Sequence, residues 1–245
     1  MSSFWTELRQ TIGWDGDTEY GPLPPLMVSM TLVTGLVDAF SYLALGHVFV
    51  ANMTGNVVFL GFALVGAPGF SVTASVVAIA AFVLGSLAGG QIWSRFRRHR
   101  GRHLNAAALV QAVFLAAGVA LAALSGSPVR AGYHYALIVV LAVGMGIQNA
   151  TARKLAVPDL TTTVLTLTIT GMAADSALAG GTGSKAGRRL IAVGTMLAGA
   201  VVGAVLILHH QIVYPLLIAL IVTAAVAAAA RMLGRSSPPW VTAET

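Results

Sequence analysis

The sequence has no cysteine among its 245 residues, and only 9% of them are charged. Without cysteine the chain has no disulfides, no thiolate metal ligands and no cysteine nucleophile. A soluble domain carries roughly 25% charged residues, so this chain has too few polar groups to cover a water-soluble surface. Hydrophobic residues make up 57% of it. These figures exclude a soluble globular domain and a disordered chain, and they indicate a polytopic membrane protein.

Motifs for catalysis and cofactor binding are also missing. The chain has no H-E-x-x-H zinc pattern, G-x-S-x-G elbow, phosphate loop or dinucleotide fingerprint. We therefore expect no enzyme, no metal and no cofactor, and we keep only His47 among the six histidines as a candidate site residue. The net charge of +6 sits in short basic clusters between apolar runs, which is typical of membrane loops and not of nucleic-acid binding.

The sequence predicts an all-α integral membrane domain over residues 23–230. Six apolar runs reach or approach the roughly 20 residues that a spanning helix needs. They cover residues 24–45, 72–93, 104–125, 133–151, 190–208 and 211–230. Before this domain, residues 1–22 predict an interfacial segment, with a frayed tail as the alternative. After it, residues 231–245 predict a short, exposed cytoplasmic tail, because Pro238 and Pro239 end any helix.

Two further apolar stretches, 47–69 and 155–181, are interrupted by polar residues. Each is either a full crossing or an extended segment followed by a helix that leaves on the side it entered. If all eight segments cross, the basic residues divide 7 to 7 between the two sides; if only six cross, they divide 13 to 1. The positive-inside rule favours the second division, with Arg130 alone outside and both termini cytoplasmic.

The two halves of the domain, about 24–125 and 133–230, share an order of features. Each has a helix end with a carboxylate or amide (Asp38 or Asn149), an extended apolar link, a Thr-containing break and an apolar helix. Three crossings per half require the second half to be inverted. Inverted repeats with interrupted helices are typical of secondary transporters, whose sites lie near the membrane midplane.

Asp38 is the main candidate for ion chemistry, since it lies about two thirds of the way along the first predicted helix. A carboxylate at membrane depth is costly unless it is paired, neutralised or functional. The position of Asp38 therefore predicts that its carboxylate couples transport to a proton or binds a cation. The alternative is a structural hydrogen bond to Gln148 or Asn149.

The two polar breaks provide the other candidates for binding a solute. We expect Thr54 to cap the helix that follows the first break and to offer a helix N-terminus to a polar or anionic group. Plain capping and helix adhesion are the alternatives. The candidate substrate-binding residues are Asp38, Asn52, Thr54, Gly55, Asn56, Gln148, Asn149, Thr161, Thr162 and Thr163. Asp159 and Asp175 flank the second break as weaker candidates.

Four glycines form small-xxx-small faces: Gly85, Gly89, Gly199 and Gly203. Such faces let helices approach closely, inside one protomer or between protomers. They therefore predict either internal packing or a homo-oligomer.

The segments TGLVDAFSYLALGHVFVANMTGNVVFLG and GIQNATARKLAVPDLTTTVLTLTITG resemble the YoaK family, bacterial membrane proteins carried as a domain of unknown function. The resemblance covers roughly residues 25–230. It implies an inner-membrane location and about six transmembrane segments, and it supplies no catalytic residues.

Together these features predict a small secondary transporter for a small polar or ionic solute, with its site between the two breaks and proton linkage through Asp38. A channel and a non-catalytic scaffold or sensor subunit are the alternatives. A membrane-embedded enzyme has less support, because no nucleophile and base stand at one depth.

Overall fold

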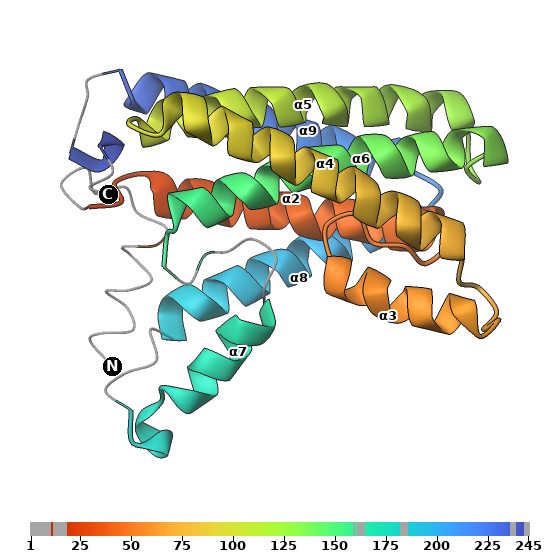
Figure 1. The fold of residues 1–245 in the computed structure, drawn as a ribbon, viewed down its shortest axis with the longest axis horizontal. Helices are drawn as coiled ribbons and strands as arrows, with labels where there is room; N and C mark the ends of the chain where they lie inside the picture. Colours follow the sequence, from red (N-terminus) through yellow and green to blue (C-terminus); the bar gives the residue numbers. More distant parts are fainter. Residues whose placement is uncertain are drawn as a thin grey trace.

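The computed structural model describes residues 11, 19–158, 160, 165–181, 186–235 and 239–242. Eight α-helices have defined bounds in this part of the chain, which contains no strand (Figure 1). They are α2 (Leu23–Ala44), α3 (Met53–Leu64), α4 (Val72–Phe96), α5 (Arg100–Ser125), α6 (Ala131–Leu155), α7 (Leu165–Ala174), α8 (Ala186–Leu208) and α9 (Val213–Leu233). Two 3-10 turns, η1 (Ala177–Ala179) and η2 (Pro239–Val241), complete the set. The predicted all-α membrane class is confirmed.

Six of these helices are long and apolar enough to cross a membrane: α2, α4, α5, α6, α8 and α9. Their lengths of 21 to 26 residues correspond to about 31–39 Å, which matches a hydrocarbon core of about 30 Å. They coincide with the six apolar runs of the sequence. α2 and α6 are the most buried, so they form the centre of the bundle.

The remaining helices, α3 and α7, have 12 and 10 residues and reach only about 15–18 Å. Figure 1 shows α3 starting partway along the flank of the bundle and running back to the end at which α2 finishes and α4 begins. α7 has the corresponding place at the opposite end, where α6 finishes and α8 begins. The short helices therefore do not cross the bundle, which agrees with six crossings and not eight.

The basic residues gather at one end of the helices. Eleven lie at or beyond the C-terminal ends of α4, α6 and α9 or at the starts of α5 and α8, which share one end of the bundle in Figure 1. They are Arg95, Arg97, Arg98, Arg100, Arg102, Arg153, Lys154, Arg188, Arg189, Arg231 and Arg235. Arg130, before α6, lies at the other end, while Arg9 and Lys185 fall outside the described residues. The described residues thus carry the expected charge separation.

Helix packing depends on glycine at two matching places. A Cβ on Gly35 of α2 would overlap the backbone of Met196 and Ala200 in α8, and a Cβ on Gly146 of α6 would overlap the backbone of Phe82 and Ser86 in α4. The partner helices supply their own glycines to these two contacts, Gly199 with Gly203 and Gly85 with Gly89. All four predicted packing glycines therefore work inside the protomer. Since their contacts are with helices of the same chain, these four glycines are not available to join protomers.

The prediction of an exposed C-terminal tail is also wrong. α9 continues to Leu233, and the side chains of Trp240 and Val241 in η2 are each only 2% exposed. The Trp240 indole packs against Gly21 and Gly101, whose missing side chains leave room for it. Burial of its large apolar surface holds this stretch on the bundle.

Candidate functional site

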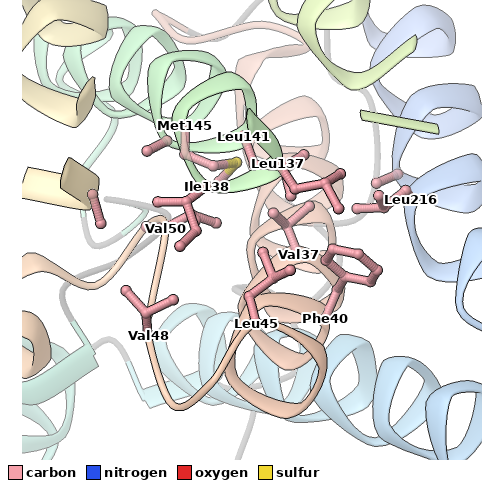
Figure 2. Packing of buried hydrophobic residues seen from close by; sticks show 14 of the residues in the cluster. Val37, Phe40, Leu45, Val48, Val50, Leu137, Ile138, Leu141, Met145 and Leu216 are labelled. Atoms are coloured by element: carbon pink, nitrogen blue, oxygen red, sulfur yellow. The ribbon is translucent and has the colours of Figure 1, made fainter. Parts of the chain in front are cut away.

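An extended link, residues 45–52, joins α2 to α3 and brings the chain back into the bundle. Figure 2 shows Val48 and Val50 of the link among the same buried side chains as Val37 of α2 and Ile138 of α6. Apolar burial therefore draws the link inward. Its backbone N–H groups must then find acceptors away from water.

One oxygen of Asp38 is the acceptor for two of those N–H groups. Its Oδ1 accepts the backbone N–H of Ala51 at 2.9 Å and that of Val50 at 3.3 Å, and the residue is 6% exposed. The predicted alternative, a structural hydrogen bond between Asp38 and Gln148 or Asn149, is therefore wrong. The carboxylate holds the link in place, and its Oδ2 has no hydrogen bond in the described structure.

Asn56 fixes the same link from α3. Its Oδ1 accepts the N–H of Phe49 at 2.9 Å, and its Nδ2 donates to the carbonyl of Phe49 at 2.6 Å. Asn56 is fully buried, with 0% exposure. Both ends of its amide therefore bind the protein's own backbone. This geometry fits a structural role better than the predicted contact with a solute.

Asn52, and not Thr54, caps α3. The Oδ1 of Asn52 accepts the N–H of Gly55 at 3.2 Å, so the prediction of a Thr54 cap is wrong. The cap belongs one residue before the first helical residue, and α3 begins at Met53. Thr54 lies in the first turn, where its side chain is exposed.

Aromatic rings cover the outer side of the link. Phe49 stacks on both Tyr42 and Phe59, with ring centroids 5.1 and 5.5 Å from its own, and the Tyr42 and Phe59 rings also contact each other. His47 packs edge-on against Tyr42, and its Nδ1 lies 3.0 Å from the carbonyl oxygen of Gly69. His47 therefore joins the link to the start of the α4 region, away from the cavity described next.

A cavity of about 610 Å³ lies where the starts of α3 and α7 approach one another. Among the described residues its lining has no charged side chain; those residues are Ala51, Asn52, Met53, Thr54, Gly55, Val58, Phe59, Phe82, Asn149, Leu165, Thr166 and Met196. The N–H groups of Met53 and Thr54 have no acceptor in the described structure, as is usual in a first helical turn. The cavity thus combines free N–H donors, two amides and two hydroxyls with apolar walls.

The lining comes from corresponding positions of the two halves. Met53 and Leu165 begin the two short helices, and Thr54 and Thr166 follow them. Phe82 and Met196 occupy equivalent places three residues before the packing glycines Gly85 and Gly199. The cavity therefore lies between two similar structural units.

Several predicted residues cannot be placed relative to the cavity or do not line it. Thr161, Thr162, Thr163 and Asp159 fall outside the described residues, and Thr166 stands in α7 where Thr54 stands in α3. Sequence analysis missed Thr166 because it aligned the two breaks by their threonines. Counting from the start of each short helix would have found it. Asp175 pairs with Arg189 at 2.9 Å at the basic end of the bundle, away from the cavity.

The two amide side chains near the end of α6, Gln148 and Asn149, have different roles. Gln148 is buried, accepts from Gln111 Nε2 at 2.6 Å, and donates to Thr34 Oγ1 at 2.8 Å and to the Met30 carbonyl at 3.1 Å. It joins α2, α5 and α6, as expected for helix adhesion. Asn149 lines the cavity, and its Nδ2 donates to the Met145 carbonyl at 2.9 Å. The network through Gln111 was not predicted, since Gln111 is the single polar side chain between Asn105 and Ser125 of α5.

Within the described residues, no group of three or more His, Cys, Asp and Glu side chains is placed to hold a metal ion. The polar groups in the described lining of the cavity are amides, hydroxyls and backbone N–H groups.

Comparison with known proteins identifies the family. Residues 26–229 match the family described as "Protein of unknown function (DUF1275)". The UPF0700 transmembrane protein YoaK of Bacillus subtilis (strain 168) is 34% identical over 152 residues, which cover 61% of this chain and 65% of that relative. No solved structure matches the chain. The family match spans all six candidate membrane helices almost completely, and this multi-pass membrane protein belongs to the DUF1275 family.

Proposed function

We propose that this protein is a small secondary transporter, and that its solute binds in the cavity between the starts of α3 and α7. The observation that carries the proposal is the meeting of two half-length helices at one cavity inside a bundle of long helices. Interrupted helices whose N-termini point at a mid-membrane site are the arrangement by which such transporters bind solutes. The cavity volume of about 610 Å³ suits a small molecule.

The lining indicates the chemistry of the solute. Two helix N-termini bring positive dipole ends, and the N–H groups of Met53 and Thr54 are free to donate. The hydroxyls of Thr54 and Thr166 add donors that can also accept. Because these described lining groups are N–H and hydroxyl donors, the cavity favours a small solute with an anionic or strongly accepting oxygen group.

The repeated packing supports alternating access. The Gly35–Gly199 and Gly146–Gly85 contacts join α2 to α8 and α6 to α4 in the same way, while α2 and α6 run in opposite directions (Figure 1). We interpret the halves as inverted repeats, so that rocking one helix pair against the other opens the cavity to each side in turn. By the positive-inside rule, the basic end and both termini face the cytoplasm of a bacterial inner membrane.

Asp38 offers a route for proton linkage. Its Oδ1 makes both hydrogen bonds to the link, so a proton on Oδ2 leaves those bonds in place. Protonation would remove the negative charge next to the link whose far end, Ala51 and Asn52, lines the cavity. A solute carrying negative charge would then bind together with a proton.

A ligand screen tests the proposal. Purified protein is unfolded thermally with chloride, nitrate, formate, acetate, phosphate or urea, and any solute that stabilises it is tested for counterflow in proteoliposomes. Binding at 100 times Kd adds about 2.7 kcal/mol of stability. The double variant Thr54→Val/Thr166→Val should lose this gain, whereas Thr73→Val, outside the cavity, should keep it. A stabilising solute whose effect and flux survive in the double variant would place the site elsewhere.

A further inference from the structure

A second recess lies at the basic end of the bundle, between the start of α5 and the end of α9. Its volume is about 420 Å³, and it shares no lining residue with the cavity at α3 and α7. The side chains that shape it are His99, Arg102, Asn105, Arg231 and Arg235. The proposed transport function does not use it.

The floor of this recess is built from close helix packing. A Cβ on Gly101 would meet Gly234 Cα at 3.4 Å and the Trp240 ring at 3.0 Å, so the two glycines let α5 and α9 touch. Asn105 Nδ2 donates to the Ala227 carbonyl at 2.8 Å and fixes the same contact one turn further along. The recess is thus held by packed structure beneath it.

His99 fixes its rim. The Nδ1 atom accepts the backbone N–H of Arg102 at 3.0 Å and caps α5. Burial, helped by the nearby charge of Arg102, lowers the pKa of His99, so the imidazole stays neutral at neutral pH. The N–H groups of Arg100 and Gly101 in this first turn have no acceptor within the described residues.

No carboxylate among the described residues neutralises the positive charge around the recess. The guanidinium groups of Arg102, Arg231 and Arg235 make no ion pair or hydrogen bond in the described part of the chain. The positive end of the α5 dipole adds to them. A neighbouring recess of about 320 Å³ shares His99 and Arg102 and brings Arg95, Arg97 and Arg98 close by. Three arginines around free N–H groups match the oxygens of a phosphate.

The position of the recess in the bundle indicates that its phosphate belongs to a lipid. The recess lies where two membrane helices end, and Met232, between Arg231 and Arg235, is 68% exposed. An acyl chain can follow the exposed apolar sides of α5 and α9 while its headgroup stays at the arginines. A zwitterionic lipid would also bring an ammonium group toward these cations, which opposes binding.

We propose that this recess binds the phosphate headgroup of an anionic phospholipid of the surrounding leaflet. Basic pockets between membrane helices at the positively charged side recognise such headgroups. The bound lipid would join α5 to α9 at the end of the bundle where Trp240 also packs.

Native mass spectrometry of the full-length protein in a non-ionic detergent tests this assignment. Phosphatidylglycerol, phosphatidylcholine with the same acyl chains, and inorganic phosphate are titrated separately. The double variant Arg231→Gln/Arg235→Gln should raise the half-saturating concentration of phosphatidylglycerol by about tenfold or more. The control Arg153→Gln/Lys154→Gln removes the same charge from the same end outside the recess, and it should change that concentration by less than about twofold.

Three results would overturn the proposal. Equal weakening by both double variants would mean diffuse attraction and not a site. Equal binding of phosphatidylcholine would exclude recognition of anionic lipid, and displacement of the lipid by equimolar inorganic phosphate would identify a site for soluble phosphate. The variant Arg231→Lys/Arg235→Lys retains the charge and is the control for misfolding. It should recover most of the binding that the glutamine variant loses.

Discussion

The backbone N–H of Ala51 donates to the Oδ1 of Asp38 at 2.9 Å, and this bond joins the far end of the link to the helix that precedes the link. The residues are 13 positions apart, so the contact closes the turn that sends the chain back into the bundle. Without it, Ala51 and Val50 would present unpaired N–H groups at membrane depth. The same carboxylate thus shapes the entrance of α3 into the cavity.

Removing this acceptor should destabilise the protein. Asp38→Ala leaves two buried N–H groups unpaired and should lower the free energy of unfolding by about 2–5 kcal/mol. Asp38→Asn keeps a carbonyl oxygen in the same place and should cost less than about 1.5 kcal/mol. Thermal unfolding in detergent measures both. If Asn destabilises as much as Ala, the charge itself, and not the acceptor geometry, holds the link.

The glycine contacts predict a sharp difference within one helix. A Cβ on Gly85 would overlap the Val143 carbonyl, whereas nothing lies within 4 Å of a Cβ on Gly90. Gly85→Ala should therefore destabilise by about 1–3 kcal/mol or more. Gly90→Ala should be neutral or stabilise by up to about 1 kcal/mol, because alanine favours the helix. Unfolding midpoints compare the two variants directly.

The second half offers the same test with Gly199→Ala and, as its control, Gly194→Ala, which also meets nothing within 4 Å. Equal effects within either pair would contradict the close packing of α2 on α8 and of α6 on α4.

The Gln111–Gln148 pair predicts non-additive behaviour. Gln148→Leu removes the oxygen that accepts from Gln111 Nε2 and the amide that donates to Thr34 Oγ1, and it should cost about 1–3 kcal/mol. The double variant Gln111→Leu/Gln148→Leu removes both amides and should recover part of that loss. A double-mutant cycle on unfolding free energies checks this. Additive losses would mean that the two amides do not form one network.

The C-terminal turn should contribute to stability. Trp240 is almost fully buried against Gly21 and Gly101, so Trp240→Ala should cost about 3–5 kcal/mol. The expected result is a lowered unfolding temperature with unchanged helix content by circular dichroism. Trp240→Phe keeps most of the apolar surface and should lose less. An unchanged unfolding temperature in the alanine variant would mean that this turn does not stabilise the bundle.

The number and class of the helices could be predicted from the sequence because membrane crossing depends on length, hydropathy and charge, which are local properties. The uneven distribution of basic residues also favoured six crossings, because Lys and Arg concentrate in the loops on one side of a membrane. Gly85, Gly89, Gly199 and Gly203 were recognised from their spacing. The spacing alone did not say which helix each face meets.

The hydrogen bonds of the site could not be predicted, because they depend on where the link lies in space. Asp38 binds the backbone of Val50 and Ala51, and a backbone acceptor or donor leaves no mark in the side-chain sequence. Asn52 and Thr54 both suit a helix cap, and only the helix start decided between them. Trp240 was expected in a tail because its partners are two glycines far away in the sequence.

Cysteine accessibility tests the central claim, a mid-membrane aqueous cavity reached from both sides, most directly. The chain has no cysteine, so Thr54→Cys, Thr166→Cys and Val113→Cys each place one thiol in an unaltered background. Val113 is the control, since it lies midway along α5 and is 68% exposed outside the cavity. A membrane-impermeant thiol reagent is applied separately to right-side-out and inside-out vesicles. The account predicts that the thiols at positions 54 and 166 react from both sides and much faster than the thiol at 113. Reaction at 54 and 166 no faster than at 113, or from one side only, would contradict it.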